Sequence, residues 1–383
     1  MAVGEASYDS FRVAPWVHAL GGFISRRPRL WIALGNLESR LIADEIEATP
    51  VAQPIYISGV ARAGSTILLE TLAQHPSLVS HRYRDYPPVF TPYWWNRFLE
   101  RVPQRSSAPA ERTHRDGIAV TPESPEAFEE VIWMAFFPDL HDPARSAVLS
   151  SEARHPEFEA FYRDHIRKLV RVRGGERYLS KDNYNISRLE YLLELFPDAR
   201  FVIPVRDPVW HIASLMKQHA LFCAGEERHP EALEHMQWVG HFEFGLDRRP
   251  INVGEPARLA RITEAWARGE EVEGWAHYWA YIYGYVADRL AANPALREAS
   301  LIVRFEELCR SPREVLDRTL AHCRLDASPA WLAERSAAIR FPSYYKPRFA
   351  PAEIETIERH TAATAARFGY SGSSADRADP APA

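Results

Sequence analysis

PIYISGVARAGSTILLETLAQ, residues 54–74, is the stretch that decides the fold of this chain. Its first residues, Pro54–Ser58, form a short apolar run that ends at Gly59, as a buried parallel strand does. Thr66–Gln74 then places apolar side chains at helical spacing. The intervening pattern G-x-x-x-x-G-x-[ST], lying between a strand and a helix, predicts a loop that binds an anion through backbone amides and the helix N-terminus.

This loop departs from an ATPase loop at one position. Ser65 stands where nucleotide hydrolases carry the lysine that reaches the β- and γ-phosphates, which argues against an ATPase or a kinase. Arg62 still supplies a cation inside the loop. An ordinary glycine-containing turn between strand and helix is the alternative for this motif taken alone.

Further strand and helix signals alternate along the chain. Apolar runs predict strands at 199–205 and 300–305, and helical spacing predicts a helix at 185–196. Two more helices are expected to open at Pro208 and Pro312, because proline suits the first helical position. Alternating strands and helices with long crossovers predict an α/β fold, a P-loop NTPase-like parallel sheet flanked by helices with helical insertions.

We expect one domain over residues 1–370. Residues 1–50 are read as a helical lead-in, and insertions at 97–175 and 220–275 are expected to form the acceptor side. The end of the chain, 371–383, is small, polar and proline-containing, so it is expected to be disordered.

Composition limits the function classes. A net charge of −5 over 383 residues argues against nucleic-acid binding, so any anion site must be local. The three cysteines, Cys223, Cys309 and Cys323, lack metal-ligand spacing and indicate reduced thiols in a cytoplasmic protein. No stretch reaches the roughly 18 apolar residues of a membrane span, and the N-terminus has no signal-peptide pattern.

A second anion site is predicted where the strand at 199–205 ends. Arg206 stands at the carboxyl end of that strand, where α/β sheets bind ligands. Ser214 follows two helical turns later and can share a face with Arg206. The pair can hold a second phosphate, whereas a capped helix beside a surface arginine is the alternative.

Together these motifs resemble the sulfotransferase family. The resemblance is carried, in the family's order, by residues 57–76 (ISGVARAGSTILLETLAQHP), 180–182 (SKD), 196–215 (FPDARFVIPVRDPVWHIASL) and 302–312 (IVRFEELCRSP). It is closest to the bacterial and tyrosylprotein or carbohydrate branches. It implies the donor 3′-phosphoadenosine 5′-phosphosulfate, with adenosine 3′,5′-bisphosphate as product, and direct in-line transfer without a metal.

The resemblance also implies roles for single residues. The 5′-phosphosulfate would contact the loop residues Arg62, Ala63, Gly64, Ser65 and Thr66. Arg206 and Ser214 would hold the 3′-phosphate, and Lys181 would steady the leaving phosphate. Lys346, in a segment similar to one that closes over the nucleotide, would touch a phosphate. A solvated lysine is the alternative for Lys181, and a surface turn is the alternative for Lys346.

The general base stays open. The family's glutamate after the P-loop helix has no counterpart in the stretch 80–85, SHRYRD. Asp85 is the nearest carboxylate and His81 is the alternative, although each can equally be a solvated loop residue. His114 and His141 are further candidates.

The acceptor is not identified by sequence. Aromatic-rich segments at 93–95, 133–137 and 275–285 are either core or the wall of an acceptor pocket, and they suit a sugar, an aromatic ring or an acyl chain. We therefore expect a small-molecule, carbohydrate or lipid acceptor. Residues 16–46 predict amphipathic helices that pack on the body, or alternatively contact a membrane surface. A P-loop kinase or NTPase and a non-catalytic nucleotide-binding module are the competing functions.

Overall fold

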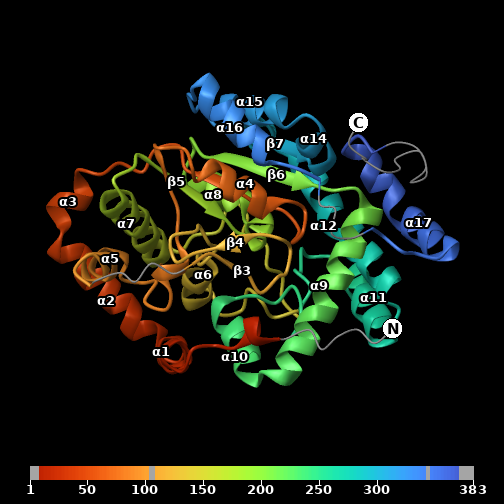
Figure 1. Ribbon diagram of the computed structural model, residues 1–383, viewed down its shortest axis with the longest axis horizontal. Helices are drawn as coiled ribbons and strands as arrows, with labels where there is room; N and C mark the ends of the chain where they lie inside the picture. Colours follow the sequence, from red (N-terminus) through yellow and green to blue (C-terminus); the bar gives the residue numbers. More distant parts are fainter. Residues whose placement is uncertain (1–7, 103–107, 342–345, 371–383) are drawn as a thin grey trace.

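The computed structural model describes residues 8–102, 108–341 and 346–370 (Figure 1). Within them, five parallel strands form one sheet in the order β2-β5-β1-β6-β7. The strands are β1 (Ile55–Ile57), β2 (Leu78–Val79), β5 (Arg177–Lys181), β6 (Arg200–Val205) and β7 (Ser300–Arg304). A short antiparallel pair, β3 (Ala110–Glu111) and β4 (Ala119–Val120), lies apart from the sheet. The predicted α/β, P-loop-like architecture is confirmed.

Alternation along the strands divides the core into two layers, because successive side chains point to opposite faces of a sheet. On one face, Ile55, Ile57 and Val202 pack with side chains of α4 (Ser65–Leu72), α14 (Phe305–Arg310), α15 (Pro312–His322) and α16 (Pro329–Ala338). On the other face, Tyr56 and Phe201 pack with α7 (Pro156–Arg173), α8 (Leu189–Leu195), α9 (Pro208–Arg228) and α12 (Glu271–Ala292). Helices therefore cover both faces, as a parallel sheet requires.

The first three helices form a flank of the molecule, drawn in red in Figure 1. They are α1 (Pro15–Ser25), α2 (Pro28–Leu41) and α3 (Ala43–Glu47). The helices α2 and α3 pack on α7, and α1 packs on α10 (Pro230–Val239). A fully buried ion pair, Glu38 to Lys168 at 3.0 Å, joins α2 to α7. The expectation that residues 16–46 form helices packed on the body is thereby met.

The remaining helices complete the two layers. They are α5 (Pro92–Leu99), α6 (Glu130–Phe136), α11 (Pro256–Ala267), α13 (Pro294–Ala299) and α17 (Pro351–Arg367), with short 3₁₀ turns at Asp9–Phe11, Tyr83–Asp85 and Tyr184–Ser187. The helix α12 packs on α9, α11 and α17. The expected insertion at 97–175 includes the whole of α7, which packs against β2 and β5 of the sheet.

Local predictions and structure differ in three places. The strand β5 carries Arg177, Ser180 and Lys181, so it lacks the apolar run that marked the other central strands. The helix expected at 185–196 is divided into the 3₁₀ turn and α8. The strand expected at 300–305 ends at Arg304. The tail from 371 lies outside the described residues. No helix in the described ranges has the length and apolarity to cross a bilayer.

Candidate active site

The P-loop lies between β1 and α4, with its backbone packed against the end of β7. Gly64 has φ +102° and caps α4, and a Cβ there would stand 2.5 Å from Cδ2 of Phe305. Glycine is required at this position both by the conformation and by the space. Arg62, with φ +72°, is strained in the left-handed region, which is a feature of ligand-binding loops.

A cavity of about 260 Å³ opens beside the loop. Its wall includes the first turn of α4, Ser65–Ile67, whose amides have no acceptor within the helix. Among the described residues, its charged lining is made of Arg62, Arg112, Arg206 and Arg340, together with Asp116. Helix-terminal amides surrounded by arginines form a site for an anion with more than one negative charge.

The second predicted anion site lies next to the loop. Arg206 is 2% exposed, donates from Nη1 to the carbonyl of Arg62 at 3.3 Å, and stacks over the ring of Phe305 at 4.5 Å. Ser214 accepts from Nε of Arg62 at 3.3 Å. Arg206 lines the small cavity, whereas Ser214 is buried behind Arg62 and lines neither cavity described here. The fold thus brings the two predicted motifs together through Arg62.

Asp116 organises the arginines of the loop. Its carboxylate accepts from Nη1 of Arg62 at 2.7 Å and from Nε of Arg112 at 3.0 Å. Burial opposes its charge, but the bonds and charges of Arg112 and Arg62 hold the pKa of Asp116 below its ordinary value. Arg112 also donates to Thr66 at 3.4 Å. Sequence reasoning missed Arg112 and Asp116, because they lie in a polar, arginine-rich loop with no motif.

A larger cavity of about 890 Å³ adjoins the same loop. It shares Arg62, Ser65, Thr66 and Arg112 with the small cavity. Lys181, at the carboxyl end of β5 and in register with Ile57, also lines it. Further walls come from the N-terminal segment around 9–17, the hairpin region at 108–130, residues 182–184 and residues 222–244.

His114 lines this cavity, as do His235 and His241. Its ring is 5.1 Å from that of Phe222 and 5.4 Å from that of His241. Burial, followed by the charges of Arg112, His241, Arg62 and Lys181, holds the pKa of His114 well below its ordinary value. The ring is therefore neutral at physiological pH. Sequence reasoning named His114 only as a lesser candidate.

Asp85 and His81 are placed elsewhere. The Asp85 carboxylate is 1% exposed and is bound by Arg173, by the backbone N–H of Arg82 at 2.8 Å and by Asn96 at 3.3 Å. Burial opposes its charge, yet His81, Arg173 and the Arg82 amide hold the pKa of Asp85 far below its ordinary value. His81 contacts His165 at 3.0 Å. Neither residue lines either cavity.

The other predicted residues differ in whether they line one of the two cavities. His141 is buried against Glu130 at 2.5 Å and lines neither cavity. Lys346 also lines neither cavity, and the residues before it, 342–345, lie outside the described part of the chain. Ala63 is fully buried, and its N–H donates to the carbonyl of Val60. The tryptophans Trp133, Trp275 and Trp279 are core residues, whereas Trp95 lines the large cavity.

Comparison with solved structures finds bacterial sulfotransferases. Sulfotransferase STF9 from Mycobacterium avium is 17% identical, with 88% of this chain and 82% of that chain covered at a TM-score of 0.48. Sulfotransferase STF1 from Mycobacterium tuberculosis is 13% identical, with 94% and 89% covered at a TM-score of 0.48. The sulfotransferase domain of the Synechococcus PCC 7002 olefin synthase is 16% identical, with 85% and 97% covered at a TM-score of 0.38.

No match was found among curated protein sequences. The family model described as the sulfotransferase family matches residues 54–248, just over half of the chain. The matched range contains the P-loop, Lys181, Arg206 and Ser214, and the last motif of the resemblance, residues 302–312, lies beyond it. The chain therefore belongs to the sulfotransferase family and is a sulfuryl-transferring enzyme.

Proposed function

We propose that the enzyme transfers a sulfuryl group from 3′-phosphoadenosine 5′-phosphosulfate to a hydroxyl or amine held in the larger cavity. One observation carries the proposal. Arg62, Ser65 and Thr66 line both the small, arginine-rich cavity and the large one. A donor whose phosphates occupy the first cavity presents its sulfate to an acceptor in the second.

The donor has two anionic ends that match two groups of residues. The first-turn amides of α4, with Arg62 and Thr66, suit the 5′-phosphosulfate. Arg206 and Ser214, which both contact Arg62, suit the 3′-phosphate. Arg112 lies between the loop and the large cavity and adds charge near the sulfate. Lys346 would join this site only if it moves toward the cavity, so its role stays a prediction.

The chemistry follows from these positions. In the transfer step the S–O bond to the donor phosphate breaks while the acceptor oxygen bonds to sulfur, in line with the leaving group. Lys181 stabilises the negative charge that develops on the leaving phosphate. The neutral His114 takes the proton of the acceptor hydroxyl, since it lies near the residues assigned to the sulfate. No step passes through a metal.

The acceptor class is proposed from the entrance of the large cavity. Trp16 of α1 lines that cavity and is 57% exposed, and Leu99 of α5 lines it beside Phe98, which is 54% exposed. Exposed apolar side chains continue along α1 and α2 at Phe23, Leu30, Leu37 and Leu41. Exposed arginines lie where the two helices meet: Arg26 and Arg27 between them, and Arg29 in the first turn of α2. Apolar and basic groups on surface helices favour an anionic lipid surface, so we propose an amphiphilic acceptor that enters from it.

A thermal-shift comparison tests the donor. Adenosine 3′,5′-bisphosphate at 100 times its dissociation constant should stabilise the protein by about 2.7 kcal/mol without added metal. Adenosine monophosphate at the same concentration should stabilise it much less, because it lacks the 3′-phosphate. Equal shifts would remove the second phosphate site from the proposal, and a preference for ATP with Mg²⁺ would favour the NTPase alternative.

Mass spectrometry tests the acceptor. Lipid and polar metabolite extracts are incubated separately with the donor and the enzyme, and products are searched for the mass of an added sulfate. A sulfated lipid product is expected, together with co-sedimentation of the protein with anionic vesicles and not with neutral ones. Sulfation confined to the polar extract would overturn the amphiphile proposal, and donor binding without any turnover would favour the non-catalytic module.

A further inference from the structure

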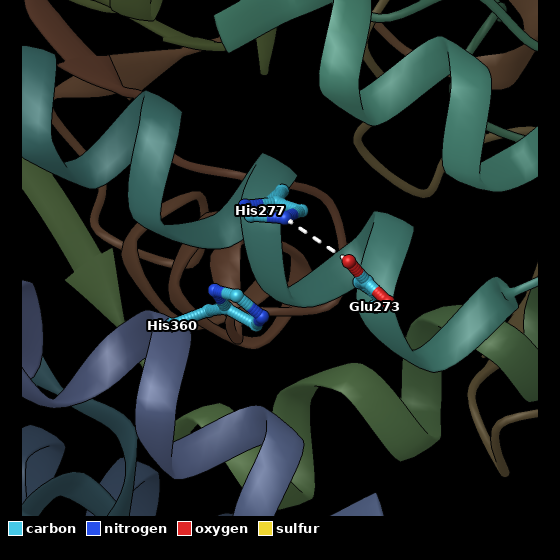
Figure 2. Close-up of side chains that lie close together, drawn as sticks. All are labelled: Glu273, His277 and His360. Carbon is cyan, nitrogen blue, oxygen red and sulfur yellow. Dashed lines mark ion pairs between the residues drawn. The ribbon is translucent and has the colours of Figure 1, made fainter.

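Three side chains with metal-ligand chemistry meet between α12 and α17, as Figure 2 shows. Glu273 and His277 are four residues apart on α12 and so project from one face of it. His360 reaches them from α17. Within the described ranges this is the one group of three or more such residues whose ligand atoms all lie within 4.8 Å of one another. None of the three lines either cavity.

We infer that Glu273, His277 and His360 form a binding site for a divalent transition-metal ion, with Zn²⁺ as the best match. Two imidazole nitrogens and one carboxylate oxygen are ligands that Zn²⁺ accepts, at about 2.0–2.2 Å from the ion. Ligand atoms around one tetrahedral ion then lie about 3.4 Å apart. Glu273 Oε1 and His277 Nε2 are already 3.6 Å apart, and the two imidazole centroids are 4.1 Å apart.

The ligand atoms of the three side chains need to move only a short distance to coordinate one ion. All three residues are partly exposed, so side-chain rotation can bring the ligand atoms inward by about 1 Å without moving the helices. Partial exposure also leaves room for water in the fourth position of a tetrahedral ion. The helix α12 is 22 residues long and α17 is 17 residues long, so both ligand-bearing elements are rigid supports.

The charges around the cluster are mixed. Arg261 and Arg359 oppose a cation here, but Arg359 is paired with Glu355 at 3.1 Å. Glu273 supplies the negative charge next to the two rings.

A metal ion bound to this cluster would connect α12 and α17. Both helices lead to residues that contact the end of β6, next to Arg206 of the proposed donor site. Beyond the end of α17, Tyr370 donates to Glu306 at 2.6 Å and to the carbonyl of Val205 at 3.1 Å. Val205 immediately precedes Arg206. From α12, Tyr283 donates to the carbonyl of Pro204 at 3.0 Å. The role of the ion is structural, since its ligands lie away from the reacting groups.

Calorimetric titration of the full-length protein with ZnCl₂, after treatment with a chelator, tests the site. We expect one ion per chain and a rise in melting temperature with Zn²⁺. His277→Ala and His360→Ala should each weaken binding by more than the roughly 10–100-fold that loss of an outer-shell partner costs. His18→Ala is the matched control, because His18 pairs with Glu234 at 2.9 Å outside this cluster. Binding of Co²⁺ should give a visible absorption spectrum that the two cluster variants lack.

Each outcome of these titrations either supports the metal site or overturns it. Absence of Zn²⁺ binding by the wild type, or equal binding by the wild type and His360→Ala, overturns the site. Melting temperatures in chelator show whether each variant is folded, and Glu273→Gln replaces any variant that is not. Affinity for adenosine 3′,5′-bisphosphate should be the same in these variants without metal, so failure of this inference would leave the proposed reaction untouched.

Discussion

Arg62 contacts both residues of the second predicted phosphate site, donating from Nε to Ser214 at 3.3 Å and accepting from Arg206 at its carbonyl oxygen at 3.3 Å. The loop that binds one end of an anionic ligand is thus held by the residues assigned to the other end. Occupation of either proposed subsite is expected to order groups that serve both. The binding free energy of a ligand that carries both phosphates is therefore expected to be more favourable than the summed binding free energies of two ligands with one phosphate each.

Arg206→Ala should weaken binding of adenosine 3′,5′-bisphosphate by about 2–4 kcal/mol, because a charge-assisted contact and the support of the Arg62 carbonyl disappear together. Calorimetry measures the affinity directly. Arg200→Ala, at the opposite end of the same strand, is the matched control and should bind as the wild type does. Unchanged affinity in Arg206→Ala, with a loss only in turnover, would contradict the assignment.

His114→Ala should lower kcat by about 10²–10⁴-fold while leaving donor affinity within a few-fold of the wild type, as expected for loss of a general base. Single-turnover assays with saturating donor measure the effect. His141→Ala serves as the comparison, since His141 is paired with Glu130 and does not itself line either cavity. A silent His114→Ala would move the base to another residue of the large cavity, with the nearby carboxylates Glu126 and Glu243 next to be tested.

Asp85→Asn should cost stability and not catalysis. The substitution leaves the buried Arg173 without its charged partner, which typically costs about 3–5 kcal/mol of unfolding free energy. Urea denaturation gives the loss, and kcat per folded molecule should stay close to that of the wild type. A hundredfold loss of turnover in a fully folded Asp85→Asn protein would restore Asp85 as the base.

Glu70→Gln should stabilise the protein at alkaline pH. Burial, helped by Asp116 and Glu126 and opposed by Arg112, raises the pKa of Glu70 to about 7. The favourable contribution of the protonated group is complete below pH about 4.5 and is lost as pH rises through about 7. The gain at pH 8 is about 1–2 kcal/mol, after allowance for partial exposure, and it should vanish near pH 4.5. A constant difference across this range would show that titration of Glu70 is not its cause.

The fold was predictable where local signals are strong. Pro54–Ser58 and residues 199–205 are apolar runs, and both strands were placed to within about two residues. The strand β5 was missed because its neighbours on both sides, β1 and β2, are what make Arg177–Lys181 a strand. Pairing with strands distant in sequence overrides local propensity, and it cannot be read from five residues.

The sequence placed the residues of the proposed donor site near one another, because Arg62 and Ser65 lie in the P-loop after β1 and Arg206 directly follows β6. Parallel pairing of the two strands brings these residues to the same edge of the sheet. Asp85 was chosen for its distance along the chain from the P-loop helix. Its actual surroundings are set by Arg173, 88 residues later, which turns the carboxylate into the core. A contact with a residue so distant in sequence cannot be predicted from residues 80–85 alone.

The strand β6 lies between β1 and β7 in the sheet, and this position limits where the gene can be truncated. The sequence match ends at residue 248, whereas β6 pairs along five residues with β7, which begins at Ser300. A fragment cut at the end of the match would lose β7 and the helix whose Tyr283 binds Pro204. It would carry β6, whose last five residues are apolar, with one side unpaired, which is a template for aggregation. Expression libraries and chimaeras therefore need a boundary beyond Tyr370, whose hydroxyl donates to the carbonyl of Val205 at the end of β6.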